Sequence, residues 1–327
     1  MRFPRLTARG ADGDKGPMAP PAPVPATVPP PSSAAIFGAA MVAVILFALT
    51  APLTRAIAGS VDPLLLGMRP VAAAAAAIPL ILILRLKGPR GGHDWLLLLL
   101  SAGGSFAFFP VVFTLGQAMT SATHGSLIQA SMPIFTGLAA AIVDRRRPGF
   151  HWWLGAALAF AGEGVLVFFR DPADPGRQAS LTGDLLVLLA SAVSASAYVA
   201  GSRLAGRISA LAATLWCVGA AGLALLPFAL LRAAHVTWGN LSLGVWVSIG
   251  ALAFGPNLIA FIAWLWALSQ GGVQRVAVFQ FAVPPLSVLI AVVFLGEKLT
   301  VSLMVALACV LGGIALARYR PGRRRDA

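Results

Sequence analysis

Two charged side chains stand inside long apolar runs of this 327-residue sequence. Arg69 lies in GMRPVAAAAAA, and Glu163 lies in WLGAALAFAGEGVLV. A charge among apolar residues is costly unless it has a partner or faces a cavity, so both positions are candidates for chemistry. A guanidinium can bind the carboxylate of a substrate, and a carboxyl group can exchange a proton. Alternatively, the two charges form a fixed ion pair that orients two helices, or they never meet.

Polar side chains at helical spacing form three further candidate faces, because residues three and four apart share one side of a helix. These faces are Ser126, Gln129 and Pro133; Gln280, Pro284 and Ser287; and Ser191, Ser194 and Tyr198. Each face can line a binding cavity, and the competing interpretation is hydrogen bonding between neighbouring helices. The candidate substrate-binding residues are Arg69, Ser126, Gln129, Tyr198, Asn257, Trp264 and Gln280, and the candidate proton-coupling residue is Glu163.

Prolines within the apolar runs predict bends. Pro256 in the stretch FGPN lacks an N–H group and its ring opposes the preceding helical turn. A kink there would make backbone carbonyls and the Asn257 amide available to a cavity. Pro133, Pro284 and Pro285 are expected to bend their helices in the same way. These four prolines are therefore the candidate gating residues.

Aromatic and titratable side chains in the same runs have simpler explanations. Trp264 could stack against an aromatic or amphipathic substrate, although packing within the core is the simpler account. His124 could titrate near neutral pH, but a lone histidine near the end of an apolar run more often serves as a structural donor. Cys217 and Cys309 lie in apolar runs and match neither a metal-binding spacing nor a disulfide framework. We therefore expect no metal and no cofactor.

The composition indicates that these residues lie in a membrane. Hydrophobic residues make up 58% of the chain and charged residues 11%, with a mean hydropathy of +0.86. A soluble domain carries about 25% charged residues, so this chain has too few charges to cover a surface in water. The formal net charge of +13 is spread between the apolar runs, which argues against binding to nucleic acid.

Ten apolar stretches approach the roughly 20 residues that a helix needs to cross a bilayer. They cover about 34–57, 63–84, 95–116, 119–143, 150–169, 181–203, 208–231, 241–268, 272–296 and 300–318. None alternates in polarity as a barrel strand would, so we predict an all-α integral membrane protein with ten transmembrane helices. Residues 1–33 are polar and proline-rich and are expected to form a disordered cytoplasmic tail. Residues 320–327 would form a short basic tail.

The distribution of Lys and Arg predicts the orientation. If both termini lie in the cytoplasm, most of the 24 Lys and Arg residues fall on the cytoplasmic side, as the positive-inside rule requires. The opposite side receives Arg55, Arg170, Arg177, Arg232 and Lys298. We therefore predict cytoplasmic N- and C-termini.

The chain also repeats itself. The stretch MPIFTGLAAAIVDRRR at 132–147 resembles VPPLSVLIAVVFLGEKL at 283–299, and a shift of 152 residues places Pro133 on Pro285. The chance similarity of apolar helices is the alternative explanation. A true repeat would divide the chain into units at 34–170 and 181–319, with five spans each.

Five is an odd number, so the second unit would enter the membrane inverted relative to the first. Inverted repeats are typical of secondary transporters.

With these features the chain resembles the EamA family of the drug/metabolite transporter superfamily over residues 34–318. The matching segments are PLSVLIAVVFLGEKLT, VALACVLGGIALA, GMRPVAAAAAA, TSATHGSLIQASMPIFTGLAAAIV and WLGAALAFAGEGVLV. The resemblance implies a ten-helix carrier of small metabolites in the cell inner (plasma) membrane, often an exporter. Amino acids or related amphipathic compounds are the substrates it implies. The chain departs from the family pattern at Arg145, where the first repeat tends to carry Glu.

The predicted function is thus secondary transport by alternating access between two inverted repeats. The expected partners are a small-molecule substrate and the lipid bilayer, and the carrier would act as a monomer or homodimer. A membrane-embedded enzyme and a non-transporting scaffold are the alternatives. An enzyme would need convergent polar side chains at a membrane face, whereas the histidines are scattered at His93, His124, His151 and His235. No Walker motif is present, which excludes ATP drive within this chain.

Overall fold

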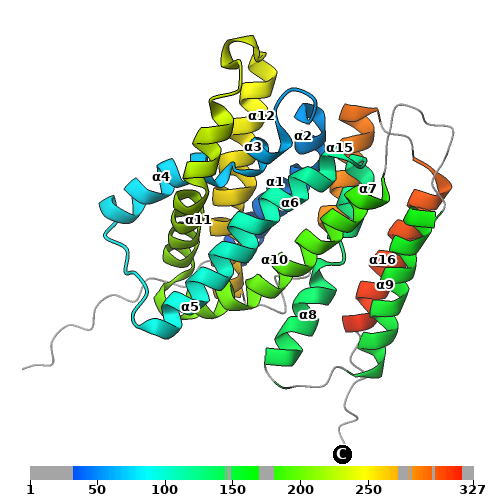
Figure 1. Cartoon of the computed structure of the whole chain (residues 1–327). Coiled ribbons are helices and arrows are strands. Elements are labelled where there is room, and N and C mark those ends of the chain that lie inside the picture. Colours follow the sequence, from blue (N-terminus) through cyan, green and yellow to red (C-terminus); the bar gives the residue numbers. More distant parts are fainter. Residues whose placement is uncertain are drawn as a thin grey trace, which may run out of the picture.

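In a computed structural model of the chain, the described residues are 32–143, 145, 149–168, 180–271, 279, 282–296 and 299–318. Every regular element within this part is helical (Figure 1). The first half contains α1 Ser33–Ala48, α2 Thr50–Ile57, α3 Pro63–Gly67, α4 Pro70–Ile83, α5 Gly92–Ser101, the π-helix η1 Ala102–Phe108, α6 Phe109–Ala118, α7 Ala122–Gln129, α8 Met132–Val143 and α9 Phe150–Phe168. The second half contains α10 Leu181–Ile208, α11 Ala210–Ala233, the 3₁₀ turn η2 Trp238–Asn240, α12 Leu243–Phe254, the π-helix η3 Gly255–Ile259, α13 Ala260–Gly271, α15 Val283–Leu295 and α16 Val301–Arg318.

Seven helical stretches of the described chain are long and apolar enough to cross a membrane. They are Ser33–Ile57, Pro63–Ile83, Gly92–Ala118, His124–Val143, Leu181–Ile208, Ala210–Ala233 and Leu243–Ala267. Two shorter apolar helices follow at Val283–Leu295 and Val301–Gly313, and α9 occupies the position of the predicted fifth span. The prediction of an all-helical membrane protein is therefore confirmed. Seven of its helices have membrane length, and the count of ten transmembrane helices stays a prediction.

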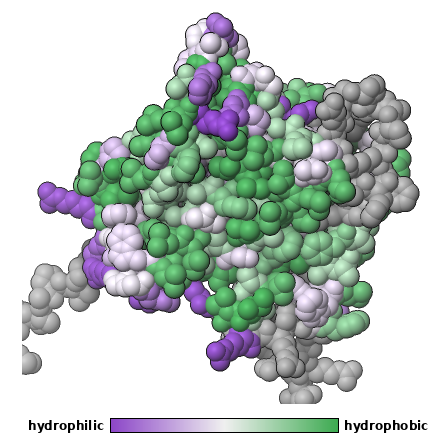
Figure 2. All heavy atoms as spheres, viewed as in Figure 1, coloured by the Kyte–Doolittle hydropathy of each residue, from purple (hydrophilic) through white to green (hydrophobic). Residues whose placement is uncertain are grey.

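The exterior of the bundle is apolar. Figure 2 shows hydrophobic side chains across the middle of the visible face, with hydrophilic residues towards its ends. Large aliphatic and aromatic residues are widely exposed, among them Ile83 at 74% and Phe294 at 78%. A protein in water would bury such side chains, whereas lipid tails solvate them at no cost.

Closely packed helix pairs organise the described part of the bundle. Helix α4 packs along α11, and α9 packs along α16 as a pair at the right of Figure 1. Helix α1 packs against α13, and α10 packs against η1 and α6. Close contact in the α9–α16 pair depends on small residues, since a methyl group added at Gly313 would lie 2.4 Å from the Gly155 carbonyl oxygen. Small residues at helix crossings are the usual way for membrane helices to approach each other closely.

Prolines sit where spans are broken. After several of these breaks the first turn of the next segment contains a proline, among them Pro52 in α2, Pro110 in α6, Pro133 in α8, Pro256 in η3 and Pro284 in α15. Proline is well tolerated there because the first N–H groups of a helix have no intrahelical acceptor.

Two of the predicted kinks take a different form in the structure. Pro284 and Pro285 open α15, which begins at Val283, so they start this helix and do not bend its interior. The preceding stretch, including Gln280, lies outside the described residues.

Candidate functional site

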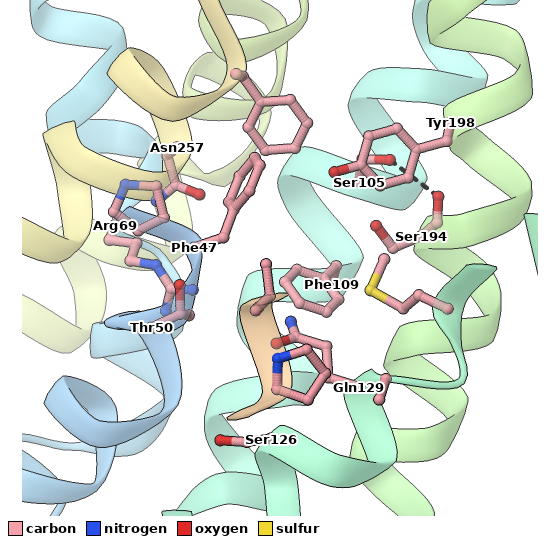
Figure 3. Close-up of a pocket in the computed structure, with 16 residues that line it drawn as sticks. Phe47, Thr50, Arg69, Ser105, Phe109, Ser126, Gln129, Ser194, Tyr198 and Asn257 are labelled. Carbon is pink, nitrogen blue, oxygen red and sulfur yellow. Dashed lines mark hydrogen bonds between the residues drawn. The ribbon is translucent and has the colours of Figure 1, made fainter. Parts of the chain in front are cut away.

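Polar side chains from several helices of the bundle line one cavity at its centre (Figure 3). Its lining consists of Phe47, Thr50, Arg69, Ser105, Phe109, Ser126, Gln129, Ala130, Met132, Ser194, Tyr198, Pro256, Asn257, Phe261, Val283 and Pro284. Figure 3 shows Arg69, Thr50 and Asn257 on one side, with Ser105, Ser194 and Tyr198 opposite them. Residues from both halves of the sequence therefore contribute to a single site.

The structure brings together five of the seven residues proposed from sequence to bind a substrate. Arg69, Ser126, Gln129, Tyr198 and Asn257 all line the cavity, although the chain separates them by up to 188 positions. Their roles in binding stay predictions, because geometry alone does not test them.

Other candidates lie elsewhere. Trp264 is buried behind the cavity wall, with its ring centroid 6.4 Å from that of Phe47, so it packs in the core. Gln280 and the side chains of Glu163 and Pro133 are outside the described part of the chain. The predicted pairing of Glu163 with Arg69 is therefore not tested.

Arg69 is held at the cavity by close packing of α3 on α6. Gly67 lies so near this helix that an added methyl group would approach the Val111 Cα to 2.5 Å. This contact brings Arg69 beside Thr114, one turn further along α6, and its Nη1 donates a hydrogen bond of 2.9 Å to the Thr114 Oγ1.

The Arg69 guanidinium keeps unused hydrogen-bonding capacity. The side chain is 4% exposed, and its buried Nε has no hydrogen-bond partner among the described atoms. No carboxylate among the described side chains lies within ion-pair distance of it. A buried cation without a counter-ion is costly, which makes this position suited to an anionic group that enters the cavity.

The Asn257 side chain is hydrogen-bonded to the backbone at the neighbouring helix break. Pro256 has no N–H group for the Leu252 carbonyl, and the Asn257 Nδ2 donates to that oxygen over 3.0 Å. The sequence interpretation expected both the freed carbonyl and the amide to serve the cavity. Instead the amide nitrogen satisfies a freed carbonyl, while the side chain still lines the site.

Hydroxyl groups in the wall connect helices. The Ser105 Oγ donates to the Ser194 carbonyl over 3.2 Å, the contact drawn in Figure 3. The Ser126 Oγ lies 2.6 Å from the Ser287 Oγ and thereby joins α7 to α15. Interhelical hydrogen bonding, the simpler alternative for these faces, therefore holds for Ser126 and Ser287.

Aromatic rings form much of the remaining lining. Tyr198 stacks on Phe261 with a centroid distance of 5.6 Å, and Phe261 meets Phe47 edge-on at 5.4 Å. The sequence interpretation missed Phe47 and Phe261. Phe261 follows Asn257 by four positions, so helical spacing from Asn257 would have identified it. Phe47 carries no comparable signal.

The cavity is narrow in this conformation. The space open to the centres of water-sized spheres is about 60 Å³, which corresponds to a few water molecules. A solute of amino-acid size would have to move wall side chains or widen the gap between helices.

In the described part of the chain, two arginine–aspartate pairs lie at the ends of the bundle, away from the cavity. Asp62 at the start of α3 accepts a 3.3 Å contact from Arg232 at the end of α11. Asp94 in the first turn of α5 pairs with Arg207 near the end of α10. Within the described residues, no group of three or more His, Cys, Asp and Glu side chains could hold a metal ion.

The chain is similar to known transporter sequences. The profile of the EamA-like transporter family matches residues 34–168 and again 181–319. A probable terminal-alkyne amino-acid exporter from Streptantibioticus cattleyicolor is 30% identical, over 79% of this chain and 83% of that protein. The aromatic amino acid exporter YddG from Ancylobacter novellus is 29% identical, over 66% of this chain and 73% of that protein. A solved crystal structure, 23% identical, superposes with a TM-score of 0.61 over 88% of this chain and 97% of the other, which supports the fold alone.

Proposed function

Because the chain belongs to the EamA-like transporter family, we propose that it is a secondary carrier of small organic metabolites whose substrate site is the central cavity. Membership in this family and the membrane-length apolar helices make it a multi-pass membrane protein. Amino acids or related amphipathic compounds are the proposed substrates, and export is the proposed direction.

The observation that carries this proposal is the buried guanidinium of Arg69 at the edge of an aromatic cavity. Its Nε has no partner among the side chains that the structure describes, so a carboxylate in the cavity would gain a charge-assisted hydrogen bond. The Phe47, Phe261 and Tyr198 rings line the same space and would accommodate an apolar or aromatic side chain. Two relatives named as amino-acid exporters support the same substrate class.

The packing of the helices supports two inverted repeats. A shift of 152 residues relates the π-helix η1 in the third predicted span to η3 in the eighth. A shift of 148 relates Pro79 inside α4 to Pro227 inside α11. The two helices that carry these prolines pack against each other, as a local two-fold axis would require.

The remaining contacts agree with the same symmetry. Helix α1 in the first predicted span packs on α13 in the eighth, and α10 in the sixth packs on η1 in the third. The pair α9–α16 would be the fifth and tenth spans. We therefore propose ten spans arranged as two inverted units of five.

Alternating access would use the breaks around the cavity. Pro256 and Pro284 both line it, and the other break prolines lie in the first turns of helices that also contribute wall residues. Broken helices at the midplane provide the flexible points of many carriers. The proton-coupling role of Glu163 and the binding role of Gln280 remain proposals for the same mechanism, in a monomer or homodimer of the inner membrane.

The family favours a carrier over the enzyme alternative, since the relatives are named as transporters. The two functions would be separated by a counterflow experiment on purified protein in liposomes. Vesicles loaded with one unlabelled compound are diluted into the labelled compound, using a panel of aromatic, aliphatic and anionic amino acids. We expect transient accumulation of at least one labelled compound. Its absence across the panel, in vesicles shown to contain folded protein, would contradict the proposed function.

A further inference from the structure

A buried histidine–aspartate pair lies outside the central cavity, at the end of the bundle where α7 and α10 begin. The His124 Nδ1 lies 3.5 Å from the Asp184 Oδ2. The His124 side chain is 15% exposed and that of Asp184 is 2% exposed. The carboxylate is thus almost sealed, while the imidazole retains a path to solvent.

Further contacts fix this pair from the side of α6. The Thr120 Oγ1 donates a hydrogen bond of 2.6 Å to the Asp184 Oδ1. The buried Gln117 Nε2 donates to the Ser121 carbonyl over 2.8 Å, and the Gln117 Oε1 has no partner among the described atoms. Burying this many polar groups in an apolar bundle costs free energy, and such clusters usually mark a functional site.

The backbone approach at this point is unusually close. A methyl group added at Gly183 would lie 2.9 Å from the Gly116 carbonyl oxygen, so α10 and α6 are in direct contact beside Asp184. This contact seals the carboxylate on that side. His124, on the short helix α7, is the member of the pair that lies outside this α6–α10 contact.

The pair joins two walls of the cavity. Helix α7 carries Ser126 and Gln129, and α10 carries Ser194 and Tyr198. His124 lies half a turn before Ser126 on the same helix. A change in the attraction between His124 and Asp184 would therefore act directly on the spacing of these walls.

The other charged groups near α7 are few. Helices α6 and α15 carry no titratable side chain, and α2 carries Arg55, whose Nη1 donates to the Ala118 carbonyl over 3.4 Å. Three helices packed against α7 carry the remaining titratable groups. These are Tyr198, Arg203 and Arg207 on α10, Cys309 and Arg318 on α16, and His151 and Glu163 on α9, of which the side chains of Arg318 and Glu163 lie outside the described part. Asp184 is thus the nearest described carboxylate to the imidazole.

We propose that His124 and Asp184 form a proton-binding site that controls the separation of α7 from α10, and with it access to the cavity. The His124 Nδ1 makes no hydrogen bond among the described atoms, but at 3.5 Å from the carboxylate the positive charge of an imidazolium would attract Asp184 and hold the two helices together. When the proton leaves for water on the exposed side of His124, the charge attraction is lost, and Asp184 keeps its bond from Thr120. This inference rests on the proposed transport function and adds to it a proton-binding site separate from the one proposed at Glu163.

The first test is independent of any substrate. Thermal unfolding in detergent would be measured between pH 5 and 8, the range in which imidazole changes charge, for wild type, His124→Gln and His235→Gln. His235 is an exposed imidazole after α11, so its substitution is a matched control. We expect the unfolding temperature of wild type to exceed that of His124→Gln by more at pH 5 than at pH 8, with His235→Gln parallel to wild type. An equal difference at both pH values would overturn the proposal.

The second test measures coupling. Counterflow rates would be compared over the same pH range for a substrate that wild type transports. The rate for wild type and His235→Gln should vary with pH over this range, in which an imidazole changes its charge, and that for His124→Gln should vary less. A pH profile that His124→Gln leaves unchanged would overturn the proposal, even if the unfolding data support proton binding.

These outcomes are distinct from failure of the proposed function, in which wild type itself would transport none of the panel. If His124→Gln does not fold, Asp184→Asn replaces it in both measurements, since it retains an acceptor for Thr120 and removes the charge. A pH-dependent stability gap for that variant would support the site, and a constant gap would count against it.

Discussion

At the scale of single residues, the environment of the Arg69 guanidinium most clearly calls for an anionic partner. It is buried and donates a hydrogen bond to Thr114, and its Nε has no partner within the described part of the chain. A buried charge in this state raises the free energy of the empty carrier, and an anionic group in the cavity would remove that cost. The residue that destabilises the empty site would thus be the one that binds the substrate.

The variant Arg69→Gln tests this role. We expect its affinity for a carboxylate-bearing substrate to fall roughly thirtyfold or more, because losing one partner of a buried charged hydrogen bond costs about 2–5 kcal/mol. Arg69→Lys should lose affinity as well, since a lysine cannot form the planar two-point contact. The measurement is the concentration dependence of counterflow.

The control is Arg232→Gln, which removes a half-exposed arginine that pairs with Asp62 at the end of the bundle. Its affinity should match that of wild type. Equal affinity of Arg69→Gln and wild type would show that the guanidinium does not bind the substrate.

At the scale of elements, the break at η3 is stabilised by one side-chain hydrogen bond. Pro256 removes the donor for the Leu252 carbonyl, and the Asn257 amide replaces it. Proline and asparagine therefore act as a unit, in which the first breaks the helix and the second compensates for the break.

A double-mutant cycle should reveal this coupling. Asn257→Ala leaves the Leu252 carbonyl without its side-chain donor, and we expect a loss of about 1–3 kcal/mol in stability. The double variant Pro256→Ala/Asn257→Ala regains a backbone N–H at position 256 and should be more stable than Asn257→Ala. Thermal unfolding in detergent measures both. Additive effects of the two substitutions would contradict the compensation.

The pair α9–α16 permits a sharper test of packing. An added methyl group at Gly313 would lie 2.4 Å from the Gly155 carbonyl oxygen, whereas one at the adjacent Gly312 meets only the Leu158 side chain at 3.8 Å. We expect Gly313→Ala to destabilise the protein by about 1–3 kcal/mol through overpacking. Gly312→Ala should be neutral or slightly stabilising, because alanine is the better helix former. Equal unfolding temperatures for the two variants would exclude close packing at Gly313.

At the scale of the whole molecule, an apolar exterior surrounds a polar centre. The exposed aliphatic and aromatic side chains need lipid around them, and polar residues from both halves meet at one cavity. This distribution is that of a membrane protein whose site lies away from lipid. The proposed inversion of the two halves would explain why equivalent helices approach the cavity from opposite sides.

Cysteine labelling can test the inversion. Gly92 begins α5 and Gly244 lies in the first turn of α12, related by the 152-residue shift, and both are exposed. In a chain whose Cys217 and Cys309 are replaced by alanine, we expect Gly244→Cys to react with a membrane-impermeant maleimide in intact cells. Gly92→Cys should react only after permeabilisation. Reaction of both from the same side would contradict the inversion, and the reverse pattern would place the termini outside.

Much of this arrangement follows from local properties of the chain. Hydropathy and length identify membrane-spanning helices without reference to their neighbours, and the helical repeat places Ser126 and Gln129 on one face. For this reason the all-helical fold was predicted correctly. Five of the seven candidate binding residues line one cavity, and their roles in binding stay predictions. The prolines also marked where helices break. Their positions did not indicate whether each proline bends a helix or begins one.

Only the tertiary structure decided which groups meet across helices. The bond from Arg69 to Thr114 spans 45 positions, and the contact of His124 with Asp184 joins helices from different halves of the chain. Sequence spacing carries no information on such pairs, because they depend on where small residues such as Gly67 and Gly183 let backbones approach. The sequence by itself therefore determined a polar-centred helical membrane protein, and close packing decided the partners of its buried charges.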